Sequence, residues 1–272
     1  MKSVADYTLI EPIGLGNHGN FWRARPPARL ASVNDEYVSV KVLESQASER
    51  DFTRMANELR LYAKVDSEFI APIVDAGHQD GRLFYTTQFF AEGSLAAPTR
   101  PLSAPEIIAI MSDACRGLHC LHEFGIAHRD IKPANIMLET NEARSLRGVI
   151  ADLGLAQVIN PGQTVTGIGP VGTIEFLAPE IIRGDVASRA SDIWSVGVTL
   201  HRSLTGTSVY EDLPDESLLH ALRHIIAVRP TIDSSLPEDQ QSLIERCLAE
   251  NPEDRFATAE ELADALEELA AP

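Results

Sequence analysis

A change in apolar patterning near residue 93 constrains the fold of this chain more than any other feature of its sequence. Before this point, short apolar runs broken by turn residues predict strands, with one helix over 48–65. Beyond it, apolar residues recur at three- and four-residue steps, which is typical of amphipathic helices. The expected strands cover 7–13, 21–25, 37–43, 70–76 and 83–90, and the expected later helices cover 104–123, 188–205, 215–227, 237–249 and 258–270.

This division predicts an α+β fold with two lobes and a joint near 88–95. Apolar residues make up 44% of the 272 residues and charged residues 23%, which is ordinary for a globular protein with a substantial core. A cleft between two lobes is a usual place for a small-molecule site. We therefore expect a ligand to bind near the joint.

The net charge of −17 disfavours binding to nucleic acid or to an anionic membrane surface. Residues 211–272 contain sixteen acidic and four basic residues, so a basic partner is a candidate for this surface. Three cysteines form no disulfide framework in a chain of this length. No apolar stretch reaches the roughly 18 residues of a membrane span or resembles a signal peptide. These features predict a cytoplasmic protein.

The first motif with chemical meaning is the glycine-rich segment 14–19, in which Gly14, Gly16 and Gly19 are spaced by one and two residues. Glycine lets backbone N–H groups approach phosphate oxygens because no Cβ stands in the way. A dinucleotide-binding fingerprint would require a helix directly afterwards, but a strand and then Pro26-Pro27 follow. Taken alone, the segment is weak evidence for phosphate binding, and an ordinary glycine turn is the simpler interpretation.

Lys41 and Glu58 are candidates for phosphate binding if their side chains form an ion pair. Lys41 lies on an expected strand among alternating apolar residues, and Glu58 lies on the expected helix over 48–65. Separately, each would be read as a solvated surface charge. Paired, the glutamate would hold the lysine rigidly enough to bind phosphate oxygens.

The segment His128-Arg129-Asp130-Ile131-Lys132-Pro133-Ala134-Asn135 places an acid, two cations and an amide within eight residues, and Asp152-Leu153-Gly154 follows. With the earlier motifs in this order, the chain resembles the eukaryotic-like (Hanks-type) Ser/Thr protein kinase family. Further matches are Gly172-Thr173, Ala178-Pro179-Glu180, the run from Ser191 to Gly197, and Asn251-Pro252-Glu253-Asp254-Arg255. In that family the last arginine pairs with the glutamate of Ala-Pro-Glu.

The resemblance covers about residues 7–268, and the compact, alanine-rich chain suggests a prokaryotic member. It implies a protein-kinase-like bilobal fold, with a strand-rich N-lobe containing one major helix and a mainly helical C-lobe. The whole chain, 1–272, would be one kinase domain. Its N-lobe would cover about 1–88, its hinge about 88–93 and its C-lobe about 94–272.

The resemblance also implies transfer of the ATP γ-phosphoryl group to protein Ser/Thr hydroxyls, with Mg²⁺ (or Mn²⁺). The implied nucleotide-binding residues are Gly14, Gly16 and Gly19 over the phosphates, Lys41 held by Glu58, and the hinge residues Gln88 and Phe90. The implied catalytic and metal-binding residues are Asp130 on the substrate hydroxyl, Lys132 on the γ-phosphate, Thr173 beside them, and Asn135 and Asp152 on the metal.

Two positions depart from the family pattern where the adenine is expected. Phe21 stands where valine is usual, and Ser39 stands where alanine is usual. A larger ring and a hydroxyl there are expected to lower the affinity for nucleotide.

Regulation is a further implication of the resemblance. Arg129 precedes Asp130, as in kinases whose activation segment is ordered by a phosphate, and Thr164 and Thr166 are candidates for autophosphorylation. Gln157 replaces a basic residue that is often present, so the phosphate pocket would be poorer than usual. The alternative is that both threonines are ordinary loop residues.

Two other functions compete with this interpretation. A pseudokinase that only binds partners should lack Lys41, Asp130, Asn135 or Asp152, and all four are present. A kinase-fold enzyme for small molecules usually lacks the Gly-Thr and Ala-Pro-Glu elements, and both are present.

A metal site is the last alternative, because Cys115, His119 and His122 share one face of an expected helix. Packing of that helix against its neighbours is the simpler interpretation.

Overall fold

The computed structural model describes residues 3–16, 19–30, 36–46, 49–141, 143, 145–152, 174–214 and 217–270. Within this part, the side chains of 15–16, 44–46, 49–52, 54–55 and 58 are not described. The described chain divides into two compact units. The first contains 3–66 and 71–91, and the second contains 67–70, 92–152 and 174–270.

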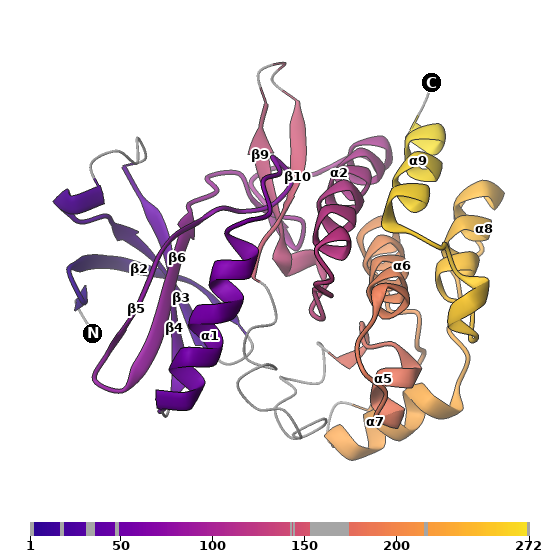
Figure 1. The fold of residues 1–272 in the computed structure, drawn as a ribbon. Coiled ribbons are helices and arrows are strands. Elements are labelled where there is room, and N and C mark those ends of the chain that lie inside the picture. The colour runs from indigo at the N-terminus through magenta and orange to yellow at the C-terminus, as the bar shows by residue number, and fades with distance from the viewer. Residues whose placement is uncertain are drawn as a thin grey trace. The chain divides into compact units, whose positions relative to one another are not determined.

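The first unit is built on a six-stranded antiparallel sheet with the order β1-β2-β3-β4-β6-β5 (Figure 1). Its strands are β1 (Ser3–Val4), β2 (Tyr7–Gly16), β3 (Gly19–Arg25), β4 (Val38–Gln46), β5 (Ile73–Gln79) and β6 (Arg82–Gln88). The 3-10 turn η1 (Ala28–Leu30) follows β3, and the helix α1 (Glu49–Tyr62) follows β4.

Alternation along β4 decides which face of this sheet is buried in the unit's apolar core. Val38, Val40 and Val42 join that core, while Ser39 and Lys41 point to the opposite face. The other members of this core are Val4, Tyr7, Leu9, Ala24 and Phe84. Because successive side chains alternate, the register of β4 fixes both the core and the face that carries Lys41.

The turns of the first unit follow local sequence signals. Strand β3 ends at Arg25, directly before Pro26-Pro27, and proline lacks the N–H that a strand interior needs. Asp80 and Gly81 join β5 to β6 in a hairpin, and both have positive φ.

The second unit is mainly helical. Its helices are α2 (Ala104–Glu123), α5 (Pro179–Arg183), α6 (Arg189–Thr205), α7 (Leu218–Ala227), α8 (Glu238–Cys247) and α9 (Ala259–Ala270), with the 3-10 turns η2 (Pro133–Asn135) and η3 (Pro252–Asp254). A small sheet of β7 (Gly93–Ser94), β8 (Ala97–Pro98), β9 (Ile136–Thr140) and β10 (Leu146–Ile150) has the order β10-β9-β7-β8.

Helix α2 lies in the middle of this unit and packs against both β10 and α9 (Figure 1). A Cβ on Gly148 of β10 would lie 2.3 Å from the carbonyl oxygen of Ile110, so only glycine allows this close approach. On the side of α9, Ser112 Oγ donates a hydrogen bond to the carbonyl of Ala263 over 3.1 Å. Arg116 adds an ion pair with Asp264.

The predicted division into a strand-rich part and a helical part is confirmed, and each expected helix is present within three residues at either end. The expected strand over 70–76 is wrong at its start. Strand β5 begins at Ile73. Ile70 belongs to the second unit, where it forms an isolated parallel bridge with Ile150. Across the described residues, no helix combines the length and the apolar character that a bilayer crossing needs.

Candidate active site

The carboxylate of Asp130 is held by two of the residues that the sequence associates with it. Lys132 Nζ lies 3.0 Å from Oδ1 and 2.9 Å from Oδ2 of Asp130. Asn135 Nδ2 donates to Asp130 Oδ2 over 2.8 Å and to the Asp130 carbonyl over 2.7 Å. The side chains of Asp130 and Lys132 are largely buried. One carboxylate therefore has a fixed orientation beside a fixed positive charge.

Asp152 is brought beside this group by strand pairing. Ile136 lies opposite Ile150 in the β9–β10 pair, and the Ala151 N–H donates to the carbonyl of Asn135 over 2.9 Å. Asp152 follows directly, buried and with a φ of 58°. The structure thus places Asp130, Lys132, Asn135 and Asp152 together.

The donor chemistry of this group fits a hard divalent cation. The amide nitrogen of Asn135 is used on Asp130, which leaves its oxygen for another partner. The carboxylate of Asp152 adds further oxygen donors, and Mg²⁺ prefers such ligands. The predicted metal residues therefore have suitable chemistry and adjacent positions.

A buried carboxylate that the sequence interpretation did not single out fixes the backbone of this loop. Asp192, in the first turn of α6, accepts hydrogen bonds from the backbone N–H groups of His128 and Arg129, each over 2.8 Å. His122 Nε2 lies 2.9 Å from the same carboxylate. Arg129 has a φ of 71°, so Asp192 holds a strained residue directly before Asp130. Its sequence signal was its place in the run from Ser191 to Gly197, which matches the family pattern as a whole.

The ring of His128 is fixed by two contacts that define its tautomer. The Asp130 N–H donates to Nδ1 over 3.3 Å, so the proton is on Nε2, which lies 3.3 Å from the Ala151 carbonyl. The residue is buried, and burial lowers the pKa of its imidazole below the usual range. His128 is therefore a neutral ring that joins the backbone of Asp130 to the backbone of Ala151, directly before Asp152.

We expect the His128 ring to stay uncharged at pH 6, where an exposed histidine, with a pKa of about 6.5, is mostly protonated. The unfolded chain then binds a proton that the folded chain does not. Stability is therefore complete above about pH 6.5 and falls as the pH is lowered below it. A titration of the ring resonances by nuclear magnetic resonance, with urea unfolding at pH 5.5 and 7.5, measures both quantities. A folded-state pKa at or above 6.5 would contradict the assignment.

The first unit carries the candidate residues for binding the nucleotide phosphates. Lys41 is buried, and Gly19 is the glycine that the structure requires, because a Cβ there would lie 2.4 Å from the Val42 carbonyl oxygen. Gly14 is exposed, with nothing near its missing Cβ. Gly16 ends β2. Glu58 lies on α1, but its side chain is outside the described residues, so its pairing with Lys41 stays a prediction.

The expected hinge follows the end of β6. Thr87 is buried, and its hydroxyl lies 3.3 Å from the Gln88 carbonyl oxygen. Gln88 is half-buried and Phe90 is buried. The ring of Phe89 meets that of Tyr37 edge to face, with 6.2 Å between centroids. The hinge residues are thus anchored to the sheet of their own unit.

Several predicted residues lie outside the part of the chain that the structure describes. They are Gln157, Thr164, Thr166 and Thr173. Their predicted roles stay predictions.

The alternative of a metal site on α2 is not supported, and packing explains its three residues. Cys115 is fully buried, which raises the pKa of its thiol. His122 is turned to Asp192, and His119 Nε2 lies 3.5 Å from Glu260. Among the described residues, no group of three or more histidine, cysteine or acidic side chains could hold a metal ion.

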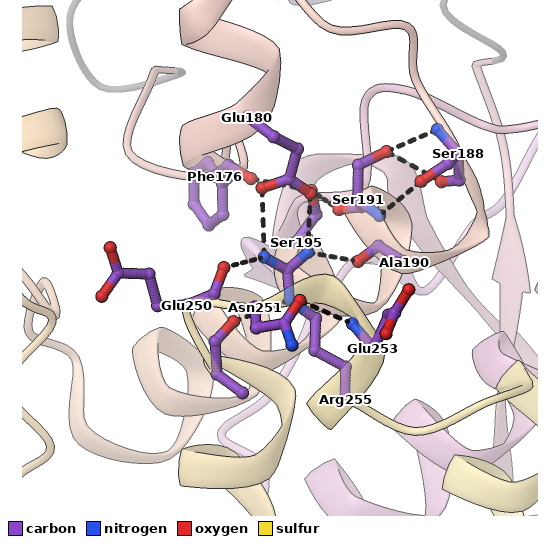
Figure 2. Close-up of polar contacts among 11 residues, drawn as sticks. Phe176, Glu180, Ser188, Ala190, Ser191, Ser195, Glu250, Asn251, Glu253 and Arg255 are labelled. Atoms are coloured by element: carbon purple, nitrogen blue, oxygen red, sulfur yellow. Dashed lines mark hydrogen bonds and ion pairs between the residues drawn. The ribbon is translucent and has the colours of Figure 1, made fainter.

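Figure 2 shows the predicted pair between Arg255 and Glu180, which is confirmed. Arg255 Nη1 and Nη2 donate to Oε1 and Oε2 of Glu180 over 2.7 Å and 3.0 Å. The same guanidinium donates to the carbonyls of Ala190 and Ala249 and lies 4.9 Å from the centre of the Trp194 ring. Its side chain is completely buried. This cluster anchors α5, which begins within the Ala-Pro-Glu motif, to the body of the second unit.

Comparison with known proteins gives one family. The family described as "Protein kinase domain" matches residues 7–266. Serine/threonine-protein kinase PknK of Mycobacterium tuberculosis is 31% identical over 97% of this chain and 24% of its own length. PknB of the same species is 30% identical over 94% of this chain and 41% of its own length. The kinase drp72 of Corynebacterium efficiens is 32% identical over 96% of this chain and 50% of its own length. The chain therefore spans about a quarter to a half of these relatives.

A solved structure agrees at the level of the fold. The crystal structure of a double mutant of the Mycobacterium tuberculosis PknI kinase domain matches with a TM-score of 0.72. The match covers 98% of this chain and 96% of the other, at 22% sequence identity. The expected kinase-like fold is thereby confirmed.

Proposed function

Because the chain belongs to the protein kinase domain family, we propose that it transfers the γ-phosphoryl group of ATP to serine or threonine hydroxyls of proteins. The family uses ATP and a divalent metal in general, and the curated relatives are named serine/threonine-protein kinases. The observation that carries the proposal is the group of Asp130, Lys132, Asn135 and Asp152, with a fixed carboxylate beside a fixed cation.

In the proposed reaction Asp130 acts on the acceptor hydroxyl. Its carboxylate orients the hydroxyl and accepts its proton as the oxygen attacks the γ-phosphorus. The bond from that phosphorus to the β–γ bridging oxygen breaks, and ADP leaves. Lys132 neutralises charge on the transferring group, whose transition state spreads negative charge over the equatorial oxygens. Thr173 is proposed to hydrogen-bond beside these two residues. The two hydrogen bonds from Lys132 keep the carboxylate oriented before substrate arrives.

Asn135 and Asp152 are proposed to hold Mg²⁺ (or Mn²⁺), which when bound supplies positive charge to the phosphates. Lys41, held by Glu58, is proposed to bind the α- and β-phosphates. Gly14, Gly16 and Gly19 would cover the phosphates, and backbone groups of Gln88 and Phe90 would bind the adenine edge.

We also propose the extent of the domain, its location in the cell and one kind of partner. Residues 1–272 would form one kinase domain, with the N-lobe, hinge and C-lobe at about 1–88, 88–93 and 94–272. Its location would be the cytoplasm, where ATP is available. A basic partner at the acidic C-terminal surface stays a prediction that rests on charge alone.

The proposal is tested with labelled ATP, Mg²⁺ and a generic protein acceptor, followed by analysis of the labelled amino acids. Label should appear on serine or threonine, and an Asp152→Asn variant should not transfer it. Label on tyrosine alone would refute the Ser/Thr assignment. Transfer to a small molecule but not to protein would favour the competing small-molecule kinase.

We also propose autophosphorylation at Thr164 or Thr166. Arg129 supports it, because its Nε is buried and has no hydrogen-bond partner among the described residues. A phosphate is a suitable partner for a guanidinium. Phosphopeptide mass spectrometry after incubation with Mg-ATP should find one of the two threonines modified in the wild type but not in Asp130→Asn. Unmodified threonines in an active preparation would refute the proposal.

A further inference from the structure

Phe21, Lys41 and Tyr85 form a row across three neighbouring strands. Phe21 of β3 lies opposite Lys41 of β4, and Lys41 lies opposite Tyr85 of β6. Directly opposed residues of antiparallel strands point to the same face of the sheet. This is the face away from the apolar core that contains Val40 and Val42.

The two aromatic rings flank the charged end of Lys41. Its Nζ lies 4.8 Å from the centre of the Phe21 ring and 5.9 Å from that of Tyr85. Lys41 is 4% exposed and Tyr85 is 2% exposed. A cation within about 6 Å of a ring centre is attracted to the ring face, and more strongly when water is excluded.

A second cation on the same face shows how different this environment is. Arg23 lies 4.8 Å from the centre of the Tyr37 ring and 5.8 Å from that of Phe89. It also pairs with Glu11, and both side chains are substantially exposed. Both cations thus lie beside two rings, but the Arg23 side chain is partly exposed, whereas Lys41 is buried.

We propose that Phe21 and Tyr85 position the Lys41 ammonium for the phosphates of the nucleotide. The inference rests on the proposed function in one respect, the contact between Lys41 and phosphate. The rings limit where the ammonium can lie, in addition to the predicted pairing of Lys41 with Glu58. Phe21 is then a positioning residue that raises affinity for phosphate-bearing nucleotides, opposite to the effect expected from its size alone.

The test compares adenosine with ADP, because only ADP reaches Lys41 with phosphates. Binding is measured by calorimetry for the wild type and Phe21→Leu, which keeps an apolar side chain but removes the ring. ADP should bind about 3- to 10-fold more weakly to the variant, as expected for one lost cation–π contact, with adenosine unchanged. Phe21→Tyr should keep wild-type affinity. Phe124→Leu, at an exposed phenylalanine of the second unit, is the matched control.

A double variant identifies the contact responsible. In a Lys41→Met background, Phe21→Leu should have no further effect on ADP binding, because the cation that the ring positions is gone. Thermal unfolding of each variant checks that the fold is kept, and Phe21→Val offers a second ring-free side chain.

Three results would overturn the inference. Equal losses for adenosine and ADP would assign Phe21 to the adenine instead. Tighter ADP binding by Phe21→Leu would mean that the rings compete with phosphate. If Phe21→Leu weakened ADP binding equally in the Lys41→Met background, the ring would not act through Lys41. Because all readouts are equilibrium binding, a failure of phosphoryl transfer in the labelled-ATP assay remains a separate result.

Discussion

Replacing Asp130 by asparagine should lower kcat by about two to four orders of magnitude. The amide keeps the shape of the side chain and can still accept from Lys132, but it cannot take a proton from the acceptor hydroxyl. The KM for ATP should change little, because Asp130 is proposed to act on the hydroxyl. Initial rates at saturating Mg-ATP, with one protein acceptor at several concentrations, measure both quantities.

The matched control is the same exchange at Asp80, in the turn between β5 and β6. Asp80 has a φ of 51°, a conformation that asparagine also tolerates. Asp80→Asn should therefore keep the fold and the rate. If Asp130→Asn retained kcat within about threefold of that control, Asp130 would not be the general base.

Replacing Arg255 by methionine should cause the largest loss of stability among the changes considered. The exchange leaves the Glu180 carboxylate in a buried position without the guanidinium that accounts for its pairing. Removing one partner of a buried ion pair costs about 3–5 kcal/mol of unfolding free energy. Urea unfolding at pH 7, followed by circular dichroism, measures the change. Arg255→Lys should also be destabilising, because an ammonium cannot donate in parallel to both oxygens.

Arg246→Met is the matched control for this change. Arg246 also pairs with a glutamate, Glu261, over 2.6 Å, but both side chains are about half exposed. An exposed pair contributes about 1 kcal/mol or less, so the control should lose little stability. The double variant Glu180→Leu/Arg255→Met should recover part of the loss by removing the unpaired charge. Equal effects at Arg255 and Arg246 would contradict the importance of burial.

The long helices could be predicted from the sequence because their signals are local. Helix α2 begins after Ser103, whose N–H and hydroxyl both donate to the carboxylate of Glu106. This helix start is readable from two residues three apart. The alternation that predicted β4 also selected the face bearing Lys41.

Two strands of the small sheet in the second unit were missed because they lack a local signal. Strands β7 and β8 contain two residues each, and β7 meets β9 through Ser94 and Met137, which are far apart in the chain. Their existence depends on tertiary contacts that no short window of sequence contains.

For the candidate site, motif spacing identified Asp130, Lys132 and Asn135, which the structure places in one hydrogen-bonded group. It did not identify Asp192 as the acceptor of the loop N–H groups, since that contact joins residues more than sixty positions apart. Nor did it show that Phe21 lies beside Lys41. That contact depends on the register of β3 against β4, which only pairing fixes.

The left-handed residues have a consequence for engineering heat resistance. A non-glycine residue in this conformation costs roughly 1–2 kcal/mol, and glycine or asparagine relieves the cost. At Ala5, in the turn between β1 and β2, that exchange touches no proposed reacting group, so resistance to heat and turnover can be improved independently. At Arg129 and Asp152 the same exchange would remove the side chains on which the proposed chemistry depends. Selection for heat resistance alone would therefore also favour exchanges at Arg129 and Asp152 that remove activity, unless activity is selected at the same time.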